Sequence, residues 1–255
     1  MTTVFTIEPI SAFSDNYIWL LHNGTDAVVV DPGDAGPVLA ALSERKLALK
    51  GILITHHHFD HVGGLEALTG ATQCEVWGPE NPKIIPVTHR VSEGDTLHIL
   101  GQAFQVMEVP GHTLDHIAYQ GEGILFCGDT LFAGGCGRVF EGTHPMMRNS
   151  LAKIRRLDPQ TKIYCAHEYT LANLQFAVAA DPKNTVLEER VTHCESLREQ
   201  NIPTVPSILA DEIATNPFLR WDAPSVMATL VAESKLIGSN SDDVFAGLRQ
   251  WKDMF

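Results

Sequence analysis

Residues 55–64 read THHHFDHVGG and directly follow a short apolar run. The segment places four of the chain's 12 histidines within six residues, far more than chance placement would give. Alternate side chains of an extended strand share a side, so His56 and His58 point the same way. If the chain then turns into a helix, Asp60 and His61 can reach the same cavity. Imidazoles and carboxylates are ligands that zinc, iron and manganese accept, so this stretch predicts a metal site.

Three further candidate ligands stand later in the chain, each just after a predicted strand. Short apolar or β-branched runs between Gly-, Pro- and Asp-rich turns predict these strands at 104–109, 123–127 and 162–165. The polar residues that follow them are His112, Asp129 and His167. Open α/β sheets build sites at the carboxyl ends of their strands, so we expect all three at one site.

Counting the candidates predicts how many metal ions the site holds. The seven side chains are His56, His58, Asp60, His61, His112, Asp129 and His167. Catalytic zinc usually takes three protein ligands and keeps one position open for water. Seven ligands divide as three, three and one shared, which predicts two divalent ions bridged by a carboxylate and by water. Such a site lowers the pKa of water to about 7 and favours a developing oxyanion.

Charge and composition limit the possible partners. The 255 residues carry 18 basic and 31 acidic side chains, a formal charge of −13, which repels nucleic acid and anionic membranes. The amino terminus lacks a secretory pattern, and no apolar run approaches about 18 residues. Five cysteines without a C-x-x-C pair argue against a disulfide framework. We therefore expect a cytoplasmic monomer that binds a small molecule, with no nucleic-acid or membrane partner.

The chain divides near Tyr169 by its pattern. Before this residue, strand-like runs alternate with turns, and after it the apolar spacing becomes helical. Asp181 and Pro182 predict an N-cap and first position of a helix that continues to about residue 200. The pattern predicts an α/β catalytic domain at 1–168 and a smaller helical domain for substrate binding at 169–255.

The ligand pattern also carries a family resemblance. H-x-H-x-D-H followed by later His, Asp and His resembles the metallo-β-lactamase superfamily. Within it, the segments GGCGR at 134–138, HEYT at 167–170 and NPFLR at 216–220 resemble the glyoxalase II (hydroxyacylglutathione hydrolase) family. This resemblance implies an αββα sandwich with a smaller C-terminal helical domain. It also implies that His56, His58 and His112 hold one metal, that Asp60, His61 and His167 hold the second, and that Asp129 bridges them.

The resemblance implies a reaction as well. Enzymes of this family cleave S-D-lactoylglutathione and similar 2-hydroxyacyl thioesters to glutathione and a hydroxy acid such as D-lactate. They use two divalent ions, commonly Zn²⁺ and sometimes iron or manganese. In our hypothesis the bridging hydroxide attacks the thioester carbonyl, one metal receives the developing oxyanion, and the other assists the departing thiolate. Asp60 and Asp129 are the carboxylates that act in catalysis as metal ligands.

Four residues match family positions that contact glutathione: Arg138, Tyr169, Arg249 and Lys252. Glutathione presents two carboxylates, and a chain of charge −13 needs local cations to bind them. An exposed charge or a helix-end cation remains an open interpretation of Arg249 and Lys252. Phe140 stands where many relatives have tyrosine, so it cannot donate the hydroxyl hydrogen bond of those relatives.

Alternatives remain open at this point. A persulfide dioxygenase of the same superfamily, with one iron held by two histidines and a carboxylate, shares much of the motif. A metal-binding scaffold without turnover is a third hypothesis. A β-lactamase is disfavoured because common lactamases have cysteine at the position of Asp129. A tRNA-processing nuclease would need a basic arm.

Overall fold

The computed structural model describes residues 5–236 and 238–255. The first four residues of the predicted 1–168 domain and residue 237 of the predicted 169–255 domain lie outside the described residues. The chain forms two compact units. The first unit comprises Met1–Glu108 and Asp115–Gly128, and the second comprises Val109–Leu114 and Asp129–Phe255. The predicted boundary at residue 168 falls inside the second unit and stays a prediction.

The first unit contains a six-stranded mixed sheet. Its strands, in spatial order, are β1 (Thr6–Ala12), β2 (Asn16–His22), β3 (Asp26–Val30), β4 (Ala48–Leu53), β5 (Glu75–Gly78) and β6 (His89–Arg90). The β1–β2 and β2–β3 pairs are antiparallel, whereas β3 to β6 run parallel. The carboxyl ends of β3 and β4 therefore meet at one edge of the sheet, where polar loop residues can converge.

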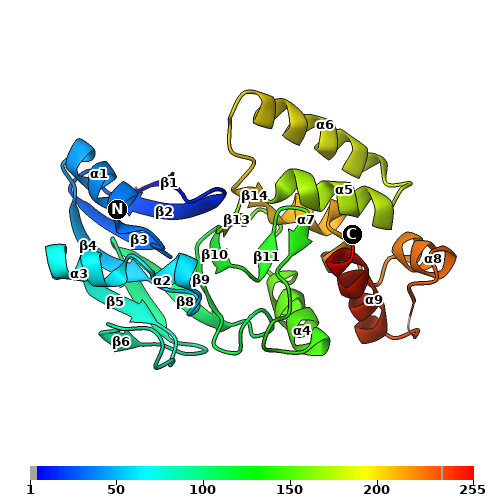
Figure 1. The fold of residues 1–255 in the computed structure, drawn as a ribbon, viewed down its shortest axis with the longest axis horizontal. Helices are drawn as coiled ribbons and strands as arrows, with labels where there is room; N and C mark the ends of the chain where they lie inside the picture. Colours follow the sequence, from blue (N-terminus) through cyan, green and yellow to red (C-terminus); the bar gives the residue numbers. More distant parts are fainter. Residues whose placement is uncertain (1–4, 237) are drawn as a thin grey trace. The chain divides into compact units, whose positions relative to one another are not determined.

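Two helices cover one face of this sheet: α1 (Ala35–Arg45) and α3 (Leu65–Thr72) (Figure 1). Strand residues such as Leu20, Val29 and Ile52 alternate toward the helices and pack against Val38 and Leu68. The strands read as nearly continuous apolar runs because both of their faces are buried. A short helix, α2 (Phe59–Val62), lies between β4 and α3 in the chain.

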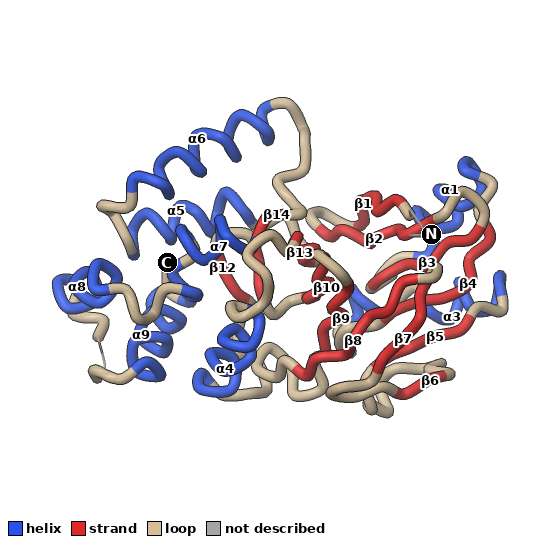
Figure 2. Tube along the Cα trace, turned by 180° about the vertical axis from the view of Figure 1, so that it is seen from behind, coloured by secondary structure: helices blue, strands red, loops and turns tan. Residues whose placement is uncertain are grey.

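A second, antiparallel sheet covers the other face. In the first unit its strands, in spatial order, are β10 (Ile124–Gly128), β9 (Ile117–Gly121), β8 (Gln102–Glu108) and β7 (Thr96–Ile99). Figure 2, from behind, shows β7, β8 and β9 in front of β3, β4 and β5. The buried Tyr119 hydroxyl donates to the carbonyls of Ile54 and Trp77, at 2.8 and 3.3 Å, and so connects the sheets. The result is a helix layer on two packed sheets.

The second unit is mostly helical. Its strands are β11 (Leu131–Phe132), β12 (Gly135–Cys136), β13 (Lys162–Cys165) and β14 (Ser207–Ile208). Its helices are α4 (His144–Ile154), α5 (Thr170–Ala180), α6 (Thr185–Glu199), α7 (Leu209–Thr215), the 3-10 helix η1 (Pro217–Leu219), α8 (Pro224–Ala232) and α9 (Ser241–Asp253). Leu174 and Ala177 of α5 pack against Leu187 and Cys194 of α6.

The predicted start of α6 at Asp181 was wrong. The helix begins three residues later than predicted, at Thr185, and its N-cap is Asn184, whose side chain accepts a hydrogen bond from the Leu187 backbone amide. The buried Asp181 carboxylate instead forms an ion pair with Arg220, at 3.0 Å. It also accepts a hydrogen bond from the side-chain amide of Asn184, at 3.1 Å. A side chain committed to a distant arginine cannot cap a helix, and the sequence shows no sign of that partner.

No helix within residues 5–236 and 238–255 combines the length and apolar character that a membrane crossing requires.

Candidate metal centre

The ligand stretch of the first unit begins where β4 ends. His56 is fully buried after the strand, His58 occupies the N-cap position of α2, and Asp60 and His61 lie in its first turn. His56 Nε2 lies 3.1 Å from His58 Nδ1, and His61 Nε2 lies 3.4 Å from Asp60 Oδ2. The strand-to-helix turn therefore arranges the four predicted ligands as two close pairs of ligand atoms.

Asp31 orients this stretch from the end of the neighbouring strand β3. Its buried carboxylate accepts hydrogen bonds from the Thr55 amide and hydroxyl, at 2.8 and 2.7 Å. The same carboxylate lies 3.0 Å from His61 Nδ1. A carboxylate this close to Nδ1 favours a proton on that nitrogen, which leaves His61 Nε2 as the ligand atom. In the same way, Thr55 Oγ1 lies 3.1 Å from His56 Nδ1. In the sequence, Asp31 reads first as a turn residue; the structure gives it this orienting role.

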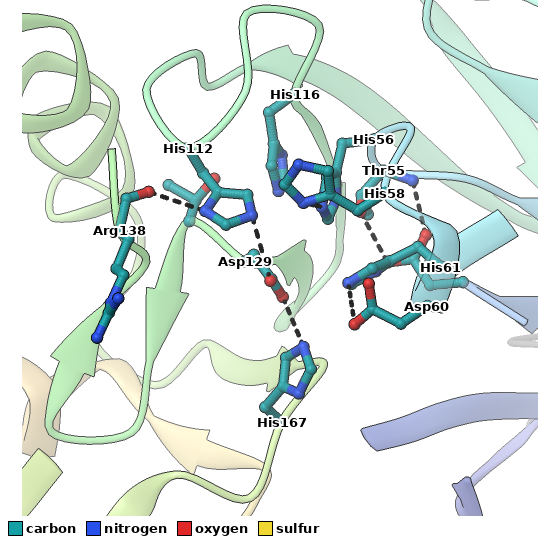
Figure 3. A network of polar contacts seen from close by, with 12 residues as sticks. Thr55, His56, His58, Asp60, His61, His112, His116, Asp129, Arg138 and His167 are labelled. Carbon is teal, nitrogen blue, oxygen red and sulfur yellow. Dashed lines mark hydrogen bonds and ion pairs between the residues drawn. The ribbon is translucent and has the colours of Figure 1, made fainter. Parts of the chain in front are cut away.

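The second unit contains His112, Asp129 and His167, which follow β8, β10 and β13 as predicted. Figure 3 shows the Asp129 carboxylate between the two imidazoles. Its Oδ2 lies 3.4 Å from His112 Nε2, and its Oδ1 lies 3.3 Å from His167 Nε2. His112 Nδ1 hydrogen-bonds the carbonyl of Arg138 at 2.8 Å, which leaves Nε2 for a ligand. Each oxygen of the Asp129 carboxylate thus lies beside a different imidazole, which suits a carboxylate that bridges two ions.

These distances suit metal ligands. An N–H···O hydrogen bond is usually 2.7–3.2 Å long. Two ligand atoms about 2.1 Å from one tetrahedral ion lie about 3.4 Å apart. The imidazole-to-carboxylate pairs in which both residues are predicted ligands have this longer separation in both units. All seven predicted ligands belong to sets of His and Asp side chains that could hold a metal ion. The donor set and its spacing therefore fit divalent ions.

Neighbouring histidines have other partners. His57, between two predicted ligands, has its Nδ1 2.9 Å from Asp115 and its Nε2 3.1 Å from the Lys83 ammonium. The His116 ring stacks on His56, with the ring centres 4.5 Å apart. These contacts give His57 a hydrogen-bonding role and His116 a packing role beside the predicted ligands.

Comparison with known proteins identifies the family. Residues 13–167 match the model of the metallo-beta-lactamase superfamily, and residues 168–255 match that of the hydroxyacylglutathione hydrolase C-terminus. A hydroxyacylglutathione hydrolase of Nitrosomonas eutropha is 50% identical over 254 residues, 98% of each chain. One of Idiomarina loihiensis is 48% identical over 249 residues, 97% of this chain and 98% of its own. The chain belongs to the hydroxyacylglutathione hydrolase family.

Solved structures support the fold of this family member. The crystal structure of ETHE1 from Myxococcus xanthus matches 98% of this chain and 99% of its own, with a TM-score of 0.65 and 24% identity. The structure of TTHA1623 in a di-iron-bound form covers 63% of this chain and 91% of its own, with a TM-score of 0.53 and 28% identity. The predicted metallo-β-lactamase-like sandwich with a helical C-terminal region is confirmed.

The residues that match glutathione-contacting positions of the hydroxyacylglutathione hydrolase family differ in exposure. The Arg138 side chain is 64% exposed, with its Nε 3.8 Å from Asp253. Tyr169 is 38% exposed, and its ring stacks on His167 with the ring centres 4.6 Å apart. Phe140 is also exposed, and its ring meets that of His112 edge-on at 5.2 Å. Tyr169 thus places a ring beside one ligand of the second unit, whereas Arg138 contacts another, His112, through its backbone carbonyl and has an exposed side chain.

Arg249 is neither an exposed charge nor a simple helix-end cation. Its side chain is 2% exposed, and Nη1 donates to the carbonyl of Cys136 at 3.0 Å. Asp253 binds its Nε and Nη2, and the guanidinium lies over the ring of Phe218. Arg249 therefore supports the loop that carries Arg138. The sequence could not show this, because the acceptor is a backbone carbonyl.

Two groups near Arg249, the Lys252 ammonium of α9 and the Cys136 thiol of β12, have shifted pKa values. Burial, and then repulsion from Arg249, lower the pKa of Lys252 to about 8. Lys252 is therefore mostly protonated at pH 7 and loses its charge as the pH rises through about 8. Burial raises the pKa of the Cys136 thiol, although Arg249 opposes the shift. A thiol that stays protonated is a poor nucleophile, as expected for a site that uses metal-activated water.

Proposed function

We propose that the chain hydrolyses the thioester of S-(2-hydroxyacyl)glutathione, in particular S-D-lactoylglutathione, to glutathione and D-lactate. The observation that carries this proposal is the identity of 48–50% to hydroxyacylglutathione hydrolases over nearly the whole chain, which includes both family regions. The arrangement of imidazoles around Asp129 supports a metal-dependent reaction.

The proposal assigns the seven ligands to two divalent ions, with zinc as the expected metal. His56, His58 and His112 hold the first ion, Asp60, His61 and His167 hold the second, and Asp129 bridges them. When bound, two such ions supply water of lowered pKa and polarise the thioester carbonyl. Asp31 and the Arg138 carbonyl fix the histidine tautomers that direct Nε2 toward an ion. The protein thus orients ligands and substrate, and a thiolate leaving group needs no protein acid.

Arg138, Tyr169 and Lys252 are proposed to bind the glutathione part of the substrate, with the C-terminal region 169–255 as its main source of contacts. An exposed guanidinium and a half-buried ammonium offer charge-assisted hydrogen bonds to its two carboxylates. Arg249 contributes by holding the loop of Arg138. Phe140 presents an apolar ring in place of a hydroxyl group.

Incubation of the purified protein with S-D-lactoylglutathione tests the proposal. Loss of the thioester should require bound metal, and a chelator should abolish it until Zn²⁺ is restored. Elemental analysis of the same preparation should find two ions per chain. Metal-replete protein that leaves the thioester intact contradicts the proposed reaction, and one iron per chain contradicts the assignment of two zinc ions. Size-exclusion chromatography and cell fractionation check the proposed monomer and its cytoplasmic location.

A further inference from the structure

Two exposed aromatic rings flank Asp60 in the first unit. Phe59 lies between His58 and Asp60 at the start of α2 and is 73% exposed. Phe13 lies in the turn between β1 and β2 and is 54% exposed. Large apolar side chains at a protein surface mark contact sites when they gather beside a functional group. The mechanism derived above uses neither ring.

Both rings rest on one contact between two glycines. A Cβ on Gly63 would lie 2.6 Å from the carbonyl oxygen of Gly33 and 2.9 Å from Phe59 Cζ. A Cβ on Gly33 would overlap the Asp60 carbonyl and lie 2.8 Å from Phe13 Cε2. Only glycine fits at these two positions. The Phe59 ring packs against the backbone of Gly63, and the Phe13 ring packs against that of Gly33.

The turn that carries Phe13 is tied to Asp60. Phe13 has a φ of 51°, a left-handed conformation that costs a residue with a Cβ about 1–2 kcal/mol. Such a conformation persists where the surrounding structure determines it, often at a binding site. Asn16, three residues later, donates from Nδ2 to Asp60 Oδ2 at 2.9 Å. The bond keeps the turn, and with it the Phe13 ring, beside the proposed metal ligand.

We propose that Phe13 and Phe59 bind the acyl part of the substrate and determine which 2-hydroxyacyl groups are accepted. This inference rests on the proposed thioester hydrolysis. The carbonyl carbon of a thioester has two substituents, the glutathione sulfur and the acyl chain. The residues proposed for glutathione, Arg138 and Lys252, suit its carboxylates. The two rings offer no charge, and they suit the hydrocarbon substituent on the hydroxyl-bearing carbon.

The test compares two substrates that differ only in this substituent. S-glycoloylglutathione carries hydrogen there, and S-mandeloylglutathione carries a phenyl ring. The quantity measured is the ratio of kcat/KM for the mandeloyl to the glycoloyl substrate on one metal-replete preparation. Because both substrates meet the same protein, the ratio is independent of metal content and of the folded fraction. That independence matters because Phe59 adjoins two proposed ligands.

We expect Phe59→Ala to lower this ratio about 10-fold, since an apolar contact of this size discriminates by about that factor. Phe59→Leu should lower it less, and Phe13→Asn, which tolerates the left-handed backbone, should also lower it. Val231→Ala, at an exposed apolar residue of α8, is the matched control and should leave the ratio unchanged.

The possible outcomes separate the two proposals. Wild-type protein that hydrolyses neither substrate rejects the proposed function itself. Wild-type hydrolysis of both, with ratios that Phe59→Ala, Phe59→Leu and Phe13→Asn all leave unchanged, rejects the acyl-binding role alone. If Phe59→Ala yields no active protein, the Leu and Asn variants still give the ratio that decides.

Discussion

The two sets of proposed ligands are assembled in opposite ways. In the first unit, four ligands come from one stretch, 56–61, at a single strand-to-helix turn. In the second unit, three ligands come from three separate loops, and the Asp129 carboxylate joins the other two. A continuous set can be recognised in the sequence by its spacing. A discontinuous set becomes visible only when the strands that precede each ligand are predicted correctly.

Their supports differ as well. His61 in the first unit is oriented by a side chain, the buried carboxylate of Asp31. His112 in the second unit is oriented by a backbone carbonyl, that of Arg138, and Arg249 holds the same loop through the carbonyl of Cys136. A substitution of Asp31 therefore removes the carboxylate that orients His61. No side-chain substitution removes the Arg138 carbonyl that orients His112, so its loop is tested through Arg249.

The largest effect is expected from Asp129→Ala, which removes the residue that joins the second set. Loss of the bridge should lower kcat about 1,000-fold or more, because the stabilisation that a metal pair gives a transition state amounts to several kcal/mol. The checks are steady-state kinetics and elemental analysis. Glu189→Ala, at an exposed position of α6, is the control. Near-normal turnover with two bound metals would falsify the bridging role.

Asp31→Asn should have the next largest effect and tests the side-chain support. Asparagine tolerates the left-handed backbone of Asp31, φ 52°, so the turn should persist. Loss of the carboxylate removes the negative charge 3.0 Å from His61 Nδ1, and metal affinity should fall about 10- to 100-fold. Competition with a fluorescent chelator measures that affinity. Unchanged affinity for both ions would show that His61 needs no anionic partner.

Arg249→Met tests the backbone support of the second set. The buried carbonyl of Cys136 loses its donor, which should cost about 1–3 kcal/mol of stability. We expect a lower Tm and a metal affinity reduced by less than in Asp31→Asn, because the carbonyl of Arg138 itself remains. Thermal unfolding with and without Zn²⁺ measures both. A variant with wild-type Tm and a raised KM alone would instead assign Arg249 to substrate binding.

The smallest effect concerns Lys252 and pH. Burial lowers its pKa to about 8, so the ammonium is present below that pH and is lost as the pH rises through it. A bound carboxylate favours the charged form, so KM should be lowest below pH 8 and rise about 5-fold above it. Lys252→Met should show the high KM at every pH, whereas Lys252→Arg should keep the low KM above pH 8. A wild-type KM that stays constant through pH 8 contradicts the contact.

Much of the fold and of the candidate site could be predicted from the sequence. The strands before Asp129 and His167 were predicted nearly to the residue, because their apolar runs end at clear turn residues. The start of α6 was wrong because Asp181, a plausible cap, is bound by Arg220 from a distant segment. The acyl-binding role that we propose for Phe13 could not be predicted, because a lone phenylalanine in a turn carries no signal.

Residue types and local spacing by themselves determined which side chains are suited to hold metal and where each stands relative to its strand. Such features depend on the chemistry of the side chain and on the period of the backbone, which neighbouring residues specify. The tertiary structure alone decided that Asp31 orients His61, that the Arg138 carbonyl orients His112 and that Arg249 is buried. Every residue has a backbone carbonyl, so a bond to one leaves no trace in the sequence, and a partner as far away as the 113 positions between Arg249 and Cys136 is chosen by packing.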